Sequence, residues 1–273
     1  MTRNPHVLCV GLVTLDVIQT VDDLPRSNVK QQALDLSVDF GGPAANACAV
    51  AAGLGASARL LTAIGTGPVA TAVRTYLERA RVLAFDLADT TVEEAFGVST
   101  VLVEQDSGDR AVVSTNAAAV PLGLADPDRI AAIDTQVQWA DVVLLDGHRM
   151  ELGLAAARAA RAAGRPVVLD GGSWKPGTEE LLPWVDVAVV SEDFVPPTGS
   201  LAELMRRCGV QAFGQSLGAR SWELEVAGAR HPIDVTPVPP EDVVDTLGAG
   251  DVLHGALAYA IGRWGLGRVV DAC

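Results

Sequence analysis

The sequence predicts an α/β fold, in which helices flank a doubly wound, mostly parallel sheet and a small sheet of different character lies beside it. Short apolar segments alternate with helix-length segments over most of the 273 residues, which is typical of parallel strands joined by right-handed crossovers. Residues 7–13 form a continuous apolar run, as in a strand buried on both faces. Four other segments alternate apolar and polar residues, as in strands with one wetted face.

The elements of the main sheet follow one another along the chain. We expect its strands at residues 7–13, 58–64, 141–146, 166–170, 186–190 and 210–217, followed by a hairpin of residues 221–226 and 230–235. We expect its helices at residues 42–54, 68–79, 151–163, 201–208 and 248–264. Pro68 in the first turn of the second helix and Gly164 after the third are typical of helix ends.

The four alternating segments predict a small antiparallel layer beside the main sheet. They span residues 16–21, 31–40, 97–104 and 111–115, and a turn-forming sequence at residues 106–109 joins the last two. The layer would therefore come from two insertions, at about residues 16–40 and 97–115. We found no internal repeat or linker of low complexity, so we expect a single domain over residues 1–273.

The composition argues against several classes of function. Acidic side chains outnumber basic ones by 34 to 20, and the longest basic cluster is Arg206-Arg207, so we expect neither nucleic acid nor a membrane surface as a partner. No apolar run approaches the roughly 18 residues of a membrane-spanning helix. Residues 7–13 are too short for a signal-peptide core, so we expect a cytoplasmic protein. The four cysteines are far apart and match neither a zinc site nor a disulfide framework.

The lysines limit how this chain could hold a phosphate group. The sequence contains only Lys30 and Lys175, and neither lies in a G-x-x-x-x-G-K-[ST] motif. Backbone amides, arginine or a metal ion would have to bind phosphates instead.

The strongest local motif is DTLGAGD at residues 245–251, which opens the helix expected at residues 248–264. Its glycines allow a sharp turn, and the first helical turn presents unpaired N–H groups and the positive end of the helix dipole, which together can bind an anion. Asp251 in the same turn could accept a proton from an attacking hydroxyl. For this motif alone, a helix N-terminus capped by aspartate is an equally good interpretation.

Two further signals lie nearer the start of the chain. Gly41 and Gly42 precede a helix that carries Asn46 one turn in, and an asparagine amide can orient sugar hydroxyls. Asp16 follows the first strand, at the edge of a parallel sheet where α/β proteins bind ligands. Taken singly, these features are better explained as a plain turn, a helix-surface amide and a loop cap.

Taken together and in this order, the motifs resemble the ribokinase-like (PfkB) carbohydrate kinase family over essentially the whole chain. The matching features are the segment of residues 10–16, the G-G-x-x-x-N segment at residues 41–46, the inserted strands and the D-T-x-G-A-G-D motif. Ser191 and residues 243–251 are similar to the ketohexokinase branch. The resemblance implies a doubly wound α/β domain with a small β-sheet lid, and ATP-dependent phosphorylation of a sugar or nucleoside hydroxyl.

The resemblance also implies roles for individual residues. The catalytic residues would be Asp251 as the base, with Gly248, Ala249 and Gly250 as the anion hole. The sugar-binding residues would be Asp16, Gly41, Gly42, Asn46 and Asp146. The nucleotide-binding residues would be Ser216, Gly218 and Thr246, and Glu192 or Asp193 would reach the metal ion, directly or through water.

The implied cofactors are ATP and Mg²⁺, with a monovalent cation such as K⁺, and the implied partner is a second copy paired through the lid to make a homodimer. The chain departs from the family at residues 190–194, where N-x-x-E is replaced by VSEDF, and at Ser221, which replaces a frequent glycine of the nucleotide loop. The sequence ends 22 residues after Asp251, whereas family members usually continue with further helices. We therefore expect missing C-terminal helices and a nucleotide site that is open on one side.

Three functions follow from these observations. The first is a sugar kinase acting on a ketose or another small carbohydrate. The second is a nucleoside kinase, against which we note that the first lid segment, residues 16–40, supplies only Phe40 as an aromatic group. The third is a catalytically silent regulator, which the altered segment at residues 191–194 favours and the complete D-T-x-G-A-G-D motif disfavours. For His148 and His254, contact with the site and simple packing both remain open.

Overall fold

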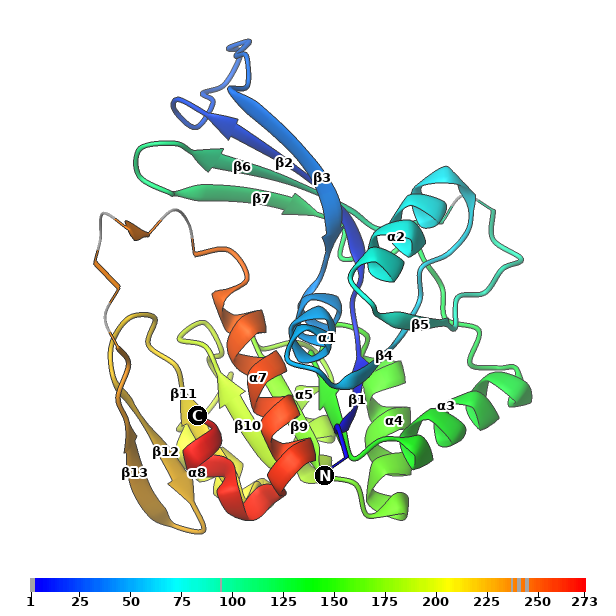
Figure 1. Cartoon of the computed structure of the whole chain (residues 1–273), viewed down its shortest axis with the longest axis vertical. Coiled ribbons are helices and arrows are strands. Elements are labelled where there is room, and N and C mark those ends of the chain that lie inside the picture. Colours follow the sequence, from blue (N-terminus) through cyan, green and yellow to red (C-terminus); the bar gives the residue numbers. More distant parts are fainter. Residues whose placement is uncertain (1–2, 94, 237, 240–241, 244–245) are drawn as a thin grey trace.

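A nine-stranded sheet lies at the centre of the described part of the chain (Figure 1). The computed structural model describes residues 3–93, 95–236, 238–239, 242–243 and 246–273. The strands are β1 (His6–Val10), β4 (Ser57–Thr62), β5 (Leu83–Asp86), β8 (Val142–Leu145), β9 (Val167–Gly171), β10 (Val187–Val190), β11 (Ala212–Gln215), β12 (Trp222–Val226) and β13 (Ala229–Ile233). Their order is β13-β12-β11-β10-β9-β8-β1-β4-β5. All neighbours from β11 to β5 pair in parallel, whereas β12 and β13 form an antiparallel hairpin at one edge.

Helices cover both faces of this sheet. One face carries α1 (Pro43–Gly53), α2 (Gly67–Arg79), α7 (Ala249–Trp264), η3 (Leu266–Arg268) and α8 (Val269–Ala272). The other carries α3 (Pro127–Trp139), α4 (Met150–Ala163), α5 (Thr178–Leu181), η1 (Leu182–Trp184) and α6 (Leu201–Cys208). Val7 and Cys9 of β1 enter the first core while Leu8 and Val10 enter the second, so both faces of the strand must be apolar. The predicted fold class is confirmed.

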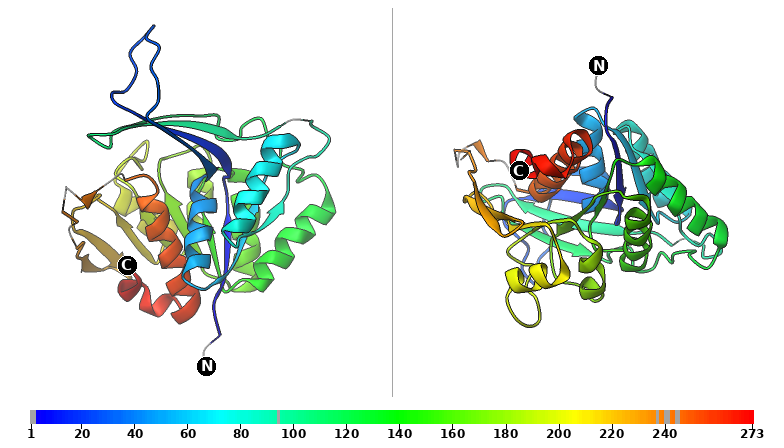
Figure 2. Two further views of the ribbon diagram at one scale, coloured as in Figure 1. Left: turned by 45° about the horizontal axis from the view of Figure 1, so that its top comes forward. Right: turned by 90° about the horizontal axis from the view of Figure 1, so that it is seen from below.

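A second, smaller sheet has the strand order β3-β2-β6-β7. Its strands are β2 (Thr14–Val21), β3 (Asp35–Gly41), β6 (Val98–Glu104) and β7 (Arg110–Ser114). The expectation of an antiparallel layer is wrong in one respect, because β2 and β6 pair in parallel. Since β2 follows β1 after only three residues, the small sheet projects beyond the carboxyl ends of the parallel strands (Figure 2).

Strand β5 and helix α3 are among the elements that the sequence-based expectations lack, as are the short helices α5 and η1. Strand β5 has only four residues at the sheet edge, and Leu83 is 55% exposed, so it lacks a clear apolar run. Helix α3 is mostly polar on its outer side, but it carries a recognisable start signal. The Asp126 side chain accepts a hydrogen bond from the Asp128 N–H at 3.0 Å, and Pro127 occupies the first helical position.

No helix among the described residues is long and apolar enough to cross a membrane.

Candidate active site

Asp251 lies in the first turn of α7, beside α1. The Asn46 side-chain amide donates a hydrogen bond to Asp251 Oδ2 at 2.7 Å. The two helices lie next to each other on the same face of the sheet (Figure 1). Gly255 permits this approach, because a Cβ atom there would lie 2.5 Å from the Ala47 carbonyl oxygen. The packing of two helices thus brings together residues that are 205 positions apart in the sequence.

The surroundings of Asp251 favour its protonated form. Burial, together with the smaller effects of the nearby Asp170 and Asp146 carboxylates, raises the pKa of Asp251 to about 7. The hydrogen bond from Asn46 and the charge of His254 act in the opposite direction. A carboxylate with a pKa near neutral pH can accept a proton from a hydroxyl and release it again.

The loop before Asp251 forms the start of α7. Gly248 is the N-cap, with φ of 76°, and Ala249 and Gly250 are exposed. The Ala249 N–H donates to the Thr246 carbonyl oxygen at 3.3 Å, a long bond that leaves the first turn facing solvent. Residues 244 and 245, including the first aspartate of the D-T-x-G-A-G-D motif, lie outside the described residues.

Thr246 connects this loop to the small sheet. The Arg110 guanidinium, on β7, donates a hydrogen bond to Thr246 Oγ1 at 2.7 Å. A cationic side chain of the small sheet therefore lies close to the helix N-terminus where an anion would be expected to bind.

The Asp16 carboxylate, on β2, lies against Gly41 at the end of β3, whose ladder partner is Thr14. The Thr14 hydroxyl donates to Asp16 Oδ1 at 2.6 Å, and a Cβ atom on Gly41 would overlap the Asp16 carboxylate. Burial raises the pKa of Asp16, as does Asp39, whereas the hydroxyls of Thr14 and Ser99 lower it. A side chain at position 41 would displace the carboxylate, which explains the glycine.

Gly42 is the N-cap of α1, with φ of 99°. A Cβ atom there would lie 2.5 Å from the Leu12 carbonyl oxygen, so the close approach of α1 to the β1–β2 connection requires glycine. The Asn46 N–H donates to the Gly42 carbonyl oxygen at 2.9 Å. The Gly41-Gly42 pair thus links the Asp16 side of the site to the Asn46 side.

Asp146 follows β8 and is only 2% exposed. Its Oδ2 atom accepts hydrogen bonds from the Leu12 N–H at 2.8 Å and the Ala44 N–H at 3.1 Å, and its Oδ1 atom accepts one from the His148 N–H at 2.9 Å. These bonds fasten the β1–β2 connection and the start of α1 to the large sheet. Direct contact between Asp146 and a ligand stays a prediction.

The residues predicted to bind nucleotide lie after β11. The Ser216 N–H and hydroxyl both donate to the Val190 carbonyl oxygen, at 2.8 and 3.3 Å. Gly218 is exposed with φ of 62°, in a turn closed by pairing of Leu217 with Arg220. The backbone at Gly218 is therefore open to solvent and could approach a ligand closely.

Glu192 and Asp193 are exposed residues after β10. Glu192 Oε1 pairs with an Arg220 guanidinium nitrogen at 2.5 Å, and Ser191 Oγ accepts a bond from the Asp193 N–H at 3.1 Å. No group of three metal-ligating side chains occurs among the described residues. Two exposed carboxylates nevertheless fit Mg²⁺, which usually takes one or two carboxylates together with water and phosphate oxygens.

Two buried residues of the site have no assigned role in the sequence-based interpretation. Asp170, in β9, is 6% exposed, and His254, one turn after Asp251, is 3% exposed. The Asp170 Oδ2 and His254 Nδ1 atoms are 3.4 Å apart. Asp170 lies near the end of a predicted strand, as Asp146 does, and this position is the signal that could have identified it.

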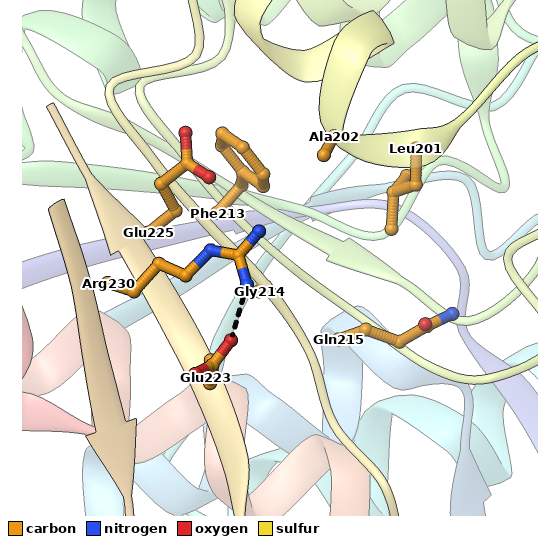
Figure 3. Close-up of a pocket in the computed structure, with 8 residues that line it drawn as sticks. All are labelled: Leu201, Ala202, Phe213, Gly214, Gln215, Glu223, Glu225 and Arg230. Atoms are coloured by element: carbon orange, nitrogen blue, oxygen red, sulfur yellow. Dashed lines mark hydrogen bonds and ion pairs between the residues drawn. The ribbon is translucent and has the colours of Figure 1, made fainter. Parts of the chain in front are cut away.

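A separate hollow of about 240 Å³ lies between α6 and the β11–β13 edge (Figure 3). Its polar residues include Glu223 and Arg230, whose side chains are 3.2 Å apart. It shares no residue with the predicted site.

Comparisons with known proteins agree with the fold described above. The family model described as pfkB family carbohydrate kinase matches residues 4–193. The chain is 25% identical to ketohexokinase from Mus musculus, over 96% of this chain and 90% of that protein, and 26% identical to a ribokinase from Arabidopsis thaliana, over 94% and 70%. The crystal structure of a ribokinase from Thermotoga maritima shares the fold, with a TM-score of 0.75 and 20% identity over 97% of this chain and 89% of that one.

Proposed function

The chain belongs to the pfkB family of carbohydrate kinases, and from that premise we propose that it transfers the γ-phosphoryl group of Mg-ATP to a hydroxyl of a small carbohydrate, such as a ketose. The observation that carries this proposal is the Asp251 carboxylate, which lies in the first turn of a helix, is held by Asn46 and has a pKa raised to about 7. A base and an anion-binding helix end side by side are what phosphoryl transfer to a hydroxyl requires.

In this mechanism Asp251 accepts the proton of the attacking hydroxyl as the oxygen approaches phosphorus in line with the leaving group. Asn46 orients the carboxylate by its hydrogen bond at 2.7 Å. The backbone amides from Gly248 to Gly250, of which Ala249 and Gly250 belong to exposed residues, would stabilise charge on the transferred group. When bound, Mg²⁺ would neutralise phosphate charge, and Glu192 and Asp193 are the residues that would hold it.

The acceptor sugar would lie between the small sheet and the large sheet. Asp16 and Asn46 supply its hydrogen-bonding groups, while Gly41 leaves room for the Asp16 carboxylate and Gly42 allows α1 to approach the β1–β2 connection. Asp146 would support the sugar site by accepting hydrogen bonds from the β1–β2 connection and from the start of α1. The nucleotide would extend from Thr246 toward Ser216 and Gly218, and a K⁺ requirement stays a prediction.

We further propose that the small sheet acts as a lid and pairs with a second copy. The support is its exposed apolar surface, since Leu36 on β3 is 59% exposed and Val112 and Val113 on β7 are 51% and 74% exposed. Light scattering on the purified protein would report a dimer if this is correct and a monomer if it is not. A cytoplasmic location, expected from the short apolar segment at residues 7–13, stays a prediction, as does the exclusion of nucleic-acid and membrane partners, expected from the acidic composition.

A coupled ADP-release assay over ketoses, pentoses, phosphorylated sugars and nucleosides tests the proposed function. We expect activity with a sugar, loss of that activity when Mg²⁺ is chelated, and a decrease of about 10²- to 10⁴-fold in kcat for Asp251→Asn. Asp134→Asn is the matched control, because Asp134 is exposed on α3, on the other face of the sheet.

Each other outcome has a definite meaning. Activity with nucleosides alone would identify a nucleoside kinase. Sugar binding in calorimetry without turnover of any acceptor would identify a regulator. Near-normal turnover by Asp251→Asn would remove Asp251 as the base.

A further inference from the structure

His254 and Asp170 form a buried pair directly behind the first turn of α7. His254 Nδ1 lies 2.7 Å from the Gly250 carbonyl oxygen, and His254 Nε2 lies 2.8 Å from the Val189 carbonyl oxygen in β10. Asp170 Oδ2 lies 3.4 Å from His254 Nδ1 and makes no hydrogen bond within the described part of the chain.

The two carbonyl contacts determine how many protons the ring carries. A neutral imidazole has one N–H donor and one nitrogen lone pair, and a carbonyl oxygen can only accept. If the ring were neutral, one nitrogen lone pair would face a carbonyl oxygen at 2.7 or 2.8 Å, which is repulsive. Both contacts are favourable only when both ring nitrogens carry a proton, and the buried Asp170 carboxylate supplies the countercharge.

We propose that His254 is a positioning residue: as an imidazolium ion paired with Asp170, it ties the first turn of α7 to β10 and sets the charge around Asp251. The turn that it holds contains Gly250, whose carbonyl accepts its proton, and Asp251 follows directly. The role assigned to Asp251 rests on the proposed function, whereas the charge state of the ring does not.

The charged groups around the pair define its effect on Asp251. Asp170 from β9 and Asp146 after β8 raise the pKa of Asp251, and His254 lowers it. Lys175, which follows β9, and His254 both lower the pKa of Asp170, which burial raises. The Cys9 thiol of β1 lies near both aspartates, but burial raises its pKa well above the ordinary value, so it contributes no charge at neutral pH. Loss of the His254 charge therefore removes the larger of the two cationic effects that offset Asp170 next to the base, and leaves Lys175.

Nitrogen NMR of the ¹⁵N-histidine-labelled full-length protein tests the charge state without any activity measurement. We expect the His254 ring to give the signature of an imidazolium at pH 7, with both nitrogens protonated. The signal is assigned by its loss in His254→Gln, and Asp170→Asn should weaken the imidazolium signature at pH 7 because the countercharge is removed. A neutral His254 ring in the wild type at pH 7 would overturn the proposal.

The pH dependence of kcat/KM tests the effect on the base. In His254→Gln the acidic limb should move to higher pH, and each unit of movement lowers the rate on that limb by about tenfold while the rate at high pH is kept. An unmoved limb in a folded variant would overturn the proposal. His231→Gln, on β13, is the matched control and should change neither measurement.

The two proposals fail in different ways. If Asp251→Asn keeps its activity, the proposed function fails while the NMR result stands. If His254→Gln does not fold, the His254 signal is assigned by elimination from variants of the three other histidines, and the wild-type and Asp170→Asn spectra still decide whether the ring is charged.

Discussion

Replacing Asn46 by alanine removes the hydrogen bond that the structure gives to Asp251. That bond, 2.7 Å long, stabilises the ionised carboxylate and lowers the pKa of Asp251. Its loss should therefore raise the pKa above its value of about 7 and leave less of the base ionised at neutral pH.

The size of the effect follows from the strength of the bond. A hydrogen bond to a charged group is worth about 1.5–3 kcal/mol, and the lower end applies because Asp251 is partly exposed. One pKa unit corresponds to about 1.4 kcal/mol, so the pKa should rise by about one unit. At pH 7 the ionised fraction would fall from about one half to about one tenth, and kcat/KM would fall about fivefold.

Profiles of kcat/KM from pH 5 to 9 separate this effect from any direct contact of Asn46 with the sugar. A lost sugar contact lowers the rate by the same factor at every pH, whereas the lost hydrogen bond moves the acidic limb and leaves the rate at pH 9 unchanged. Asn4→Ala, at an exposed position near the start of the chain, is the control. An acidic limb that stays in place in Asn46→Ala would refute the reasoning.

Two further predictions concern binding and stability. Gly41→Ala should raise the sugar KM about tenfold, equivalent to about 1.4 kcal/mol, because the new Cβ displaces the Asp16 carboxylate. The control is Gly53→Ala, where a Cβ would meet open space and the KM should match the wild type. An unchanged KM for Gly41→Ala would contradict the packing argument. Asp251→Asn should stabilise the fold at pH 8 by an amount on the order of 1 kcal/mol, reduced by the partial exposure of the side chain. In the folded wild type the pKa of Asp251 is about 7, above its ordinary value of 3.8. Between these two pH values the folded state binds a proton that the unfolded state has lost, so the free energy of unfolding falls as the pH rises from about 4 to about 7. Thermal unfolding should show the stabilisation at pH 8 and almost none at pH 4, and an equal difference at both would contradict the assignment.

The sequence was sufficient for the elements with strong patterns. The apolar run of β1 and the glycines before α1 and α7 identify a parallel strand and two helix starts from local chemistry alone. The weaker elements depend on their neighbours. Strand β5 is a strand because it pairs with β4 at the sheet edge, and β2 pairs in parallel with β6 because both leave the large sheet in the same direction. Neither pairing has a local signature.

The residues of the candidate site also fall into those that a local sequence signal identifies and those that depend on packing between distant elements. Asp251 and Asn46 could each be identified from a helix start, but their contact depends on the packing of α1 against α7. His254 could not be interpreted from sequence, because a single histidine in a helix carries no pattern and its two carbonyl acceptors lie on different elements. Asp146 illustrates a third case: its place at a strand end predicts a ligand contact, which stays a prediction, while its three backbone partners could not be foreseen because they lie on other segments.

The topology of the sheet explains why so many carboxylates of an acidic protein meet in one place. Asp146 and Asp170 end the neighbouring strands β8 and β9, and Asp251 lies at the start of the helix that packs over them. The helix N-terminus attracts the negative charge of Asp251, while burial and the two other carboxylates oppose it, and the opposing effects dominate because the pKa is raised to about 7. The charge that we propose for His254 acts against these carboxylates, and its loss would leave more of Asp251 protonated at neutral pH. In the proposed mechanism, a charged histidine between Asp170 and the first turn of α7 therefore helps a carboxylate in a buried acidic site to act as the base near pH 7.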